Sequence, residues 1–107
     1  MPYVYRTTFD IDTKDIDQLQ IGRSLQLSIA YLKAFLVNEP GFINARAMYS
    51  LHDEPMTHVA FESTWEDWGT LEAHRERSPF AESKMLHRFE LKVAPQNLAD
   101  HIYEEIA

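Results

Sequence analysis

The sequence of 107 residues contains no cysteine and only three glycines. The absence of cysteine excludes disulfide bonds, thiolate nucleophiles, cysteine-ligated zinc and iron–sulfur clusters. The glycines, Gly22, Gly41 and Gly69, are scattered, so the chain has no glycine-rich loop to cradle phosphate groups. Thiol chemistry and motif-based nucleotide binding are therefore excluded.

Positive charge and long hydrophobic runs are also scarce. Ten Lys and Arg residues against seventeen Asp and Glu residues give a formal net charge of −7 at pH 7, which argues against a nucleic-acid partner. No apolar run is long enough to cross a membrane, and the first residues carry no hydrophobic signal segment. We therefore expect a cytoplasmic protein with neither a nucleic-acid nor a membrane partner.

The residue pattern that is present alternates between strands and helices. Residue type and hydrophobic period predict strands over 3–11, 42–51, 58–65 and 88–93, helices over 14–38 and 66–77, and a short helical piece over 78–87. Asp12 or Thr13 is the expected N-cap of the first helix. The tail after Pro95 is predicted to form a short amphipathic helix.

The predicted order β-α-β-β-α-β is that of the ferredoxin-like fold, an α+β class with one four-stranded antiparallel sheet. We expect a single domain, with residues 1–94 forming the ferredoxin-like unit and 95–107 a helical tail of the same domain. The helices of such a fold cover only one face of the sheet. The other face needs cover, and dimerisation is the usual solution.

Strand alternation separates the residues of the two sheet faces. The apolar set, expected under the helices, is Tyr3, Tyr5, Thr7, Phe9, Ile43, Ala45, Ala47, Tyr49, Leu51, Val59, Phe61, Ser63, Trp65, Phe89, Leu91 and Val93. The opposite set is Arg6, Thr8, Asn44, Arg46, Met48, Glu62, Thr64, Glu90 and Lys92. The mixed polarity of this second set favours a charge-paired homodimer interface.

Four short motifs occur in a specific order between residue 39 and about residue 90. They are Pro40-Gly41-Phe42, Thr64-Trp65-Glu66, Leu71-Glu72-Ala73-His74 and Ser78-Pro79-Phe80. With the long helix before them, they resemble the antibiotic biosynthesis monooxygenase (ABM) domain family of dimeric α+β barrels. The resemblance implies a homodimer and, in one branch of the family, oxygenation of a small aromatic phenol- or quinol-like molecule without any cofactor.

A candidate site follows from the side chains expected between sheet and helices. His74 comes three residues after Leu71, so it points inward with that apolar stripe, and a histidine can act as a base toward a phenol. We therefore assign a catalytic role to His74, Tyr49 and Trp65, and substrate binding to Tyr5, Thr7, Ser63 and His87. The alternative is a plain core, in which His74 is a helix-surface or helix-packing histidine that only hydrogen-bonds, and small hydroxyls such as those of Thr7 and Ser63 bond to nearby backbone.

Two other site chemistries fit the residues less well. In the heme-degrading branch, the resemblance implies an asparagine on the first strand, where this chain has Arg6 or Thr7, and a tryptophan at the position of His74. The implied heme ligand falls near Lys84, with His87 one turn later. For metals, the residues flanking one turn (His52, Asp53, Glu54 and His58) and those of the tail (His101, Glu104 and Glu105) match no established ligand spacing.

No metal and no cofactor are therefore predicted. A non-catalytic reading stays open beside the enzyme: a dimeric small-ligand-binding or accessory module. An enclosed cavity reaching both His74 and Tyr49 would favour the enzyme.

Overall fold

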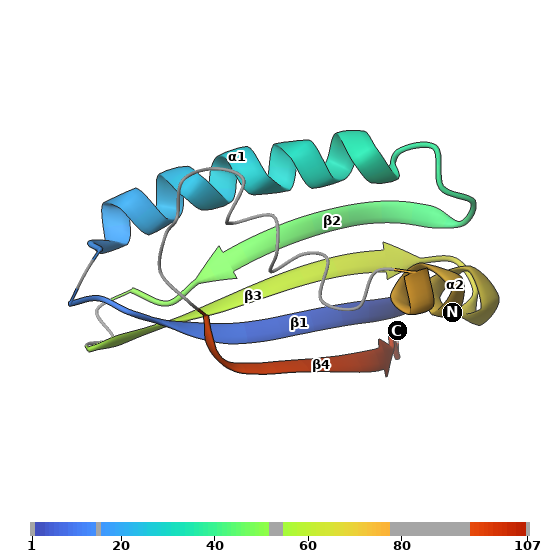
Figure 1. Cartoon of the computed structure of the whole chain (residues 1–107). Coiled ribbons are helices and arrows are strands. Elements are labelled where there is room, and N and C mark those ends of the chain that lie inside the picture. The colour runs from blue at the N-terminus through green and yellow to red at the C-terminus, as the bar shows by residue number, and fades with distance from the viewer. Residues whose placement is uncertain (1, 15, 52–54, 78–94, 107) are drawn as a thin grey trace.

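The computed structural model describes residues 2–14, 16–51, 55–77 and 95–106. Along these residues the elements are β1 (Tyr3–Asp12), α1 (Gln18–Leu36), β2 (Phe42–Tyr49), β3 (Met56–Trp65), α2 (Trp68–Arg77) and β4 (Gln96–Glu104) (Figure 1). The strands form one antiparallel sheet in the order β2-β3-β1-β4. The predicted ferredoxin-like α+β topology is confirmed.

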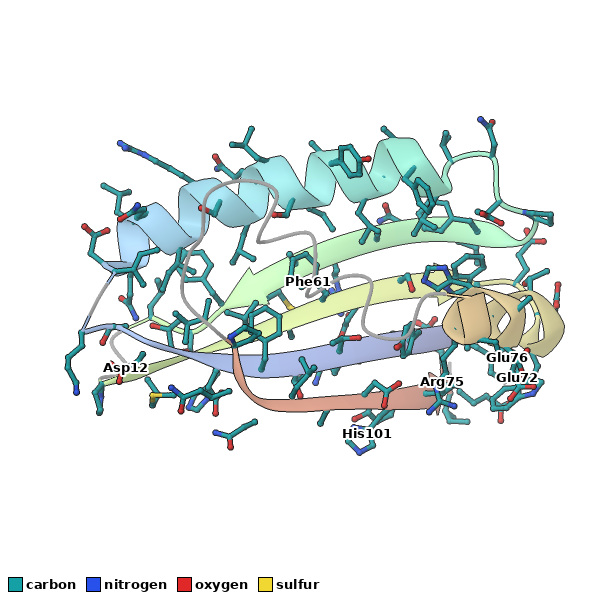
Figure 2. All side chains as sticks on the ribbon, viewed as in Figure 1. Asp12, Phe61, Glu72, Arg75, Glu76 and His101 are labelled. Atoms are coloured by element: carbon teal, nitrogen blue, oxygen red, sulfur yellow. The ribbon has the colours of Figure 1, made fainter. Side chains whose placement is uncertain are left out.

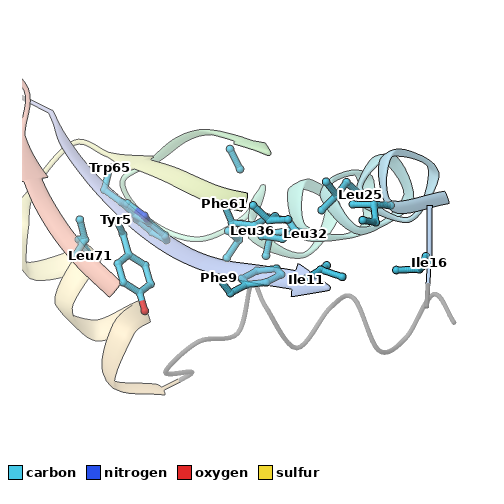
Figure 3. Packing of buried hydrophobic residues seen from close by; sticks show 13 residues of the cluster. Tyr5, Phe9, Ile11, Ile16, Leu25, Leu32, Leu36, Phe61, Trp65 and Leu71 are labelled. Atoms are coloured by element: carbon cyan, nitrogen blue, oxygen red, sulfur yellow. The ribbon is translucent and has the colours of Figure 1, made fainter. Parts of the chain in front are cut away.

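The core lies between α1 and the inner face of the sheet. Leu32 and Leu36 of α1 pack beside Phe9 and Phe61 (Figure 3), whose rings stack with centroids 6.1 Å apart. Phe9 and Phe61 occupy inward positions of β1 and β3, as strand alternation predicts. Burying these apolar side chains is the main favourable contribution to the stability of the domain.

Helix α1 begins four residues later than the sequence pattern predicts. Its N-cap is Asp17, whose carboxylate accepts a hydrogen bond of 2.8 Å from the backbone N–H of Gln20. Asp12 instead accepts from the backbone N–H of Lys14 in the preceding turn. The delay lets the side chain of Ile16 enter the core before the helix starts.

A β-bulge changes the predicted inner face of β2. The register with β3 shifts between Phe42 and Asn44, so Phe42 packs on Trp65 with ring centroids 5.5 Å apart. Ile43 is left 50% exposed, and Leu51, beyond the end of the strand, is 61% exposed. The prediction that Ile43 and Leu51 face the core is wrong: Ile43 is the extra residue of the bulge, and Leu51 lies beyond Tyr49, the last residue of the strand.

Gly41 gives a physical reason for the glycine of the Pro-Gly-Phe motif. Its φ is +79°, a backbone conformation that favours glycine. A Cβ atom there would lie 2.5 Å from the Thr70 hydroxyl of α2. The turn before β2 therefore approaches α2 more closely than a larger residue would allow.

The largest correction concerns the C-terminal tail. Residues 96–104 form β4, an edge strand paired antiparallel with β1, and not the predicted amphipathic helix. Ile102 of β4 packs against the core. The strand is favoured because it pairs the backbone groups along the edge of β1, which a helix would leave unpaired.

The strand predicted over residues 88–93, with Phe89, Leu91 and Val93, lies outside the described residues, as does the helical piece over 78–87.

Candidate functional site

Three predicted site residues, Tyr5, Trp65 and His74, meet in one buried cluster. Tyr5 and Trp65 project from the inner faces of β1 and β3 beside α2 (Figure 3). The His74 ring stacks on Trp65 with centroids 5.0 Å apart and meets Tyr5 edge-on at 6.0 Å. His74 is only 2% exposed, which confirms the inward orientation that its spacing from Leu71 predicts.

The Tyr5 hydroxyl connects this cluster to the edge strand. It donates a hydrogen bond of 3.0 Å to Oδ2 of Asp100 on β4. Arg75, on α2 near the end of β4 (Figure 2), donates from Nε to the same oxygen at 3.1 Å. The contact raises the pKa of Arg75, first through the hydrogen bond and then through the charge of Asp100. A tyrosine hydroxyl, a carboxylate and a guanidinium thus border the aromatic cluster.

The two small hydroxyls on the inner sheet face differ from each other. Ser63 accepts a hydrogen bond of 2.9 Å from the Trp65 indole N–H, so its hydroxyl fixes the orientation of the indole. Thr7 is fully buried, yet its Oγ1 has no hydrogen-bond partner among the described residues. The expectation that Thr7 would bond to nearby backbone is therefore not met within this part of the chain. The Ser28 hydroxyl of α1 is in the same situation.

The structure does not bring Tyr49 to this cluster. Tyr49 pairs with Val59 on β3, six residues before Trp65, which corresponds to about 20 Å along the strand. Its hydroxyl approaches α1 where Gly22 has no side chain. There it lines a separate hollow of about 340 Å³ between α1 and β2. His74 does not line this hollow, so the expectation of one cavity shared by His74 and Tyr49 is not met by it. His87, the other distant member of the predicted set, lies outside the described residues.

The outer sheet face carries a second, charged cluster. Glu62 is 6% exposed, and its two carboxylate oxygens accept from Nε of Arg6 at 2.7 Å and Nε of Arg46 at 2.6 Å. Burial raises the pKa of Glu62, but the hydrogen bonds and charges of Arg46 and Arg6 outweigh burial, so this pKa lies below its ordinary value. The three residues line a hollow of about 560 Å³.

Further along the same face, the carboxylate of Asp10 contacts the imidazole ring of His58. Its Oδ1 lies 2.5 Å from Nδ1 of His58, and its Oδ2 accepts from the Asn97 amide at 2.8 Å. Burial raises the pKa of Asp10, but these two hydrogen bonds and the charge of His58 lower it further than burial raises it. Within the described ranges, no group of three or more His, Cys, Asp or Glu side chains is placed to hold a metal ion.

The described helices include none that is long and apolar enough to cross a bilayer. Residues His52, Asp53 and Glu54, considered above as metal ligands, lie outside the described part of the chain.

Sequence analysis missed Asp100 and Arg75. With the tail interpreted as a helix, nothing in the sequence indicated that Asp100 would lie beside Tyr5. Arg75 follows His74 directly, but its contact depends on β4 lying next to β1. The opposite charges of the two residues carried no signal of pairing, because 25 residues separate them in the chain.

Comparison with known proteins identifies the fold. No family model matches the chain, and no curated protein sequence matches it. Among solved structures, a Nitrosomonas europaea protein provisionally named an antibiotic biosynthesis monooxygenase superposes with a TM-score of 0.61 and 13% identity. The match covers 98% of this chain and 90% of that one.

Two further structures have the same architecture. SnoaB, a cofactor-independent oxygenase from Streptomyces nogalater, matches with a TM-score of 0.58 and 12% identity over 99% of this chain and 94% of its own. A dimeric protein of unknown function and ferredoxin-like fold from Bacteroides fragilis matches with a TM-score of 0.60 and 12% identity over 96% of each chain. At these identities the comparisons establish a shared fold.

Proposed function

We propose that this protein is an ABM-type monooxygenase that oxidises a small aromatic phenol- or quinol-like molecule without a cofactor. The observation that carries the proposal is the buried cluster of Tyr5, Trp65 and His74, with the Tyr5 hydroxyl oriented by Asp100. It lies in a fold shared with a cofactor-independent oxygenase. Aromatic side chains with a few fixed polar groups are typical of the lining of a site for a flat aromatic molecule.

The chemistry assigned to the cluster is proton abstraction in a dry environment. His74 accepts the acidic proton of the substrate, and the resulting electron-rich anion reduces molecular oxygen. The substrate supplies all four electrons that reduce oxygen: a ring C–H carbon and the phenol C–OH carbon become the two C=O groups of a quinone, one oxygen atom enters the product, and the other leaves as water with the two hydrogens. Low exposure of the base limits side reactions with water.

Oxygen uptake with a panel of phenols and quinols tests this function. We expect His74→Ala to lower kcat by about 10²- to 10⁴-fold, the contribution of a general base. His74→Phe, which keeps a ring against Trp65, should show a similar loss. Gln20→Ala, at an exposed position of α1 away from the cluster and from the outer sheet face, is the control and should keep full activity. Wild-type protein that binds these molecules without consuming oxygen would instead be a ligand-binding module.

We also propose that the protein is a homodimer joined through the outer sheet face. The outer face carries the Arg6–Glu62–Arg46 cluster, which is partly desolvated already and lies in a broad hollow. A protein of similar fold is described as dimeric. A two-fold axis would place this cluster against its own copy, so each interface residue acts twice.

Light scattering at micromolar concentration tests the dimer. The wild type should show twice the 12.5 kDa chain mass. We expect Arg46→Glu to give the monomer mass, because it places a second carboxylate beside Glu62 in both protomers. Arg23→Glu, the same charge change on the exposed surface of α1, should leave the dimer intact. A monomeric wild type would contradict the proposed interface.

A further inference from the structure

The buried hydroxyl of Thr7 is the strongest unexplained feature near the aromatic cluster. Its side chain is 0% exposed, and Oγ1 has no hydrogen-bond partner within the described ranges. A buried polar group left unpaired destabilises the folded state, so such groups are rare in native proteins. Valine has almost the same shape and would fit the position without this loss, so the hydroxyl is left open to a partner that the described residues do not supply.

The neighbours of Thr7 indicate what that partner is. Thr7 lies directly opposite Asp100 in the pairing of β1 with β4, and side chains of directly opposed residues lie on one face about 5 Å apart at Cβ. Tyr5 is two residues away on the same face of β1. Its hydroxyl donates to Oδ2 of Asp100, as does Arg75, so neither of these bonds engages Oδ1.

We propose that Thr7, Tyr5 and Asp100 form a subsite for a neutral hydroxyl group of the bound molecule, an inference that rests on the proposed aromatic-binding function. The ligand hydroxyl donates to the Asp100 carboxylate and accepts from Thr7 Oγ1. The Asp100–Tyr5 hydrogen bond fixes the position of the carboxylate. The subsite thus adds a polar anchor beside the stacked rings of Trp65 and His74.

This arrangement predicts which ligands are rejected. A carboxylate or phosphate group cannot donate to Asp100 and is repelled by its charge. An ether oxygen can accept from Thr7 but leaves the carboxylate without a donor. A site built to bond a hydroxyl discriminates against analogues that lack it, because its own polar groups are then left unpaired.

Three matched probes and one matched pair of variants test the subsite. The probes are 2-naphthol, 2-methoxynaphthalene and 2-naphthoate, with Kd measured by calorimetry under nitrogen so that no turnover is needed. The variants are Thr7→Val and Thr57→Val, and Thr7→Ser is added as the variant that keeps the hydroxyl. Both threonines are fully buried on the inner sheet face, but the Thr57 hydroxyl accepts a hydrogen bond of 3.1 Å from Gln18, eight residues along β3 from Trp65.

We expect the wild type to bind 2-naphthol, to bind the methoxy analogue about tenfold more weakly, and not to bind the naphthoate. Thr7→Val should weaken 2-naphthol binding by about 3- to 10-fold, the effect of one lost hydrogen bond. It should leave the Tm of the ligand-free protein equal or higher, because no protein group loses a partner. Thr57→Val should lower Tm and leave binding unchanged, and Thr7→Ser should bind 2-naphthol like the wild type.

The subsite is overturned if the wild type does not bind 2-naphthol, if the methoxy analogue binds equally well, or if Thr7→Val lowers Tm as Thr57→Val does. The outcome is separate from that of the oxygenase proposal. Thr7-dependent binding without oxygen uptake would support the subsite and contradict the oxygenase. Oxygen uptake that Thr7→Val leaves unchanged in both KM and kcat would do the reverse.

Discussion

Replacing Trp65 by alanine is expected to lower the free energy of unfolding by about 3–5 kcal/mol, a large part of the stability of a small domain. The indole is 0% exposed. It contacts Phe42 and His74 through its faces and edge, and donates its N–H to Ser63. Removing it leaves a cavity where β2, β3 and α2 meet. It also removes the N–H group that donates a hydrogen bond to the Ser63 hydroxyl.

Trp68 provides the matched control for this prediction. It is 44% exposed and meets Tyr3 edge-on with centroids 5.7 Å apart, so Trp68→Ala should cost about 1 kcal/mol or less. Urea unfolding followed by circular dichroism measures both variants in the same way. Equal losses for the two tryptophans would show that Trp65 does not hold the second helix to the sheet.

Ending the chain after Pro95 is expected to abolish the soluble folded state. The truncation removes β4, with its ladder to β1 and the packing of Ile102. It exposes the edge of β1, a long strand whose unpaired backbone groups promote aggregation. It also removes Asp100, the partner of both Tyr5 and Arg75. A peripheral tail helix, as the sequence pattern suggested, would be dispensable by comparison.

Ending the chain after Glu105 is the control for the truncation. It removes only Ile106 and Ala107, beyond the last residue of β4, and it keeps the hydrogen bond of 2.9 Å from the Glu105 N–H to the Pro2 carbonyl. Ile106 is 78% exposed, so little packing is lost. Size-exclusion chromatography and circular dichroism compare the two truncations. A monodisperse, folded chain ending at Pro95 would contradict the structural role assigned to β4.

Local patterns in the sequence determined most of the architecture. The two-residue alternation of β1 and β3 placed Tyr5, Thr7, Phe61 and Trp65 on the buried face, and the structure confirms each of them. The three-residue step from Leu71 to His74 predicted the inward histidine in the same way. Both predictions succeed because side-chain direction repeats with a fixed period within one strand or one helix.

Tertiary contacts decided the structure of the C-terminal tail and which candidate site residues come together. The apolar spacing of the tail fits a helix or a strand, and only the open edge of β1 selects the strand that brings Asp100 to Tyr5. The register of β2 with β3 places Tyr49 far from His74. Whether the Thr7 hydroxyl has a hydrogen-bond partner depends on the side chains that pack around it from other strands and helices. Pairing and packing join residues that are distant in the chain, so no local period of the sequence encodes these outcomes.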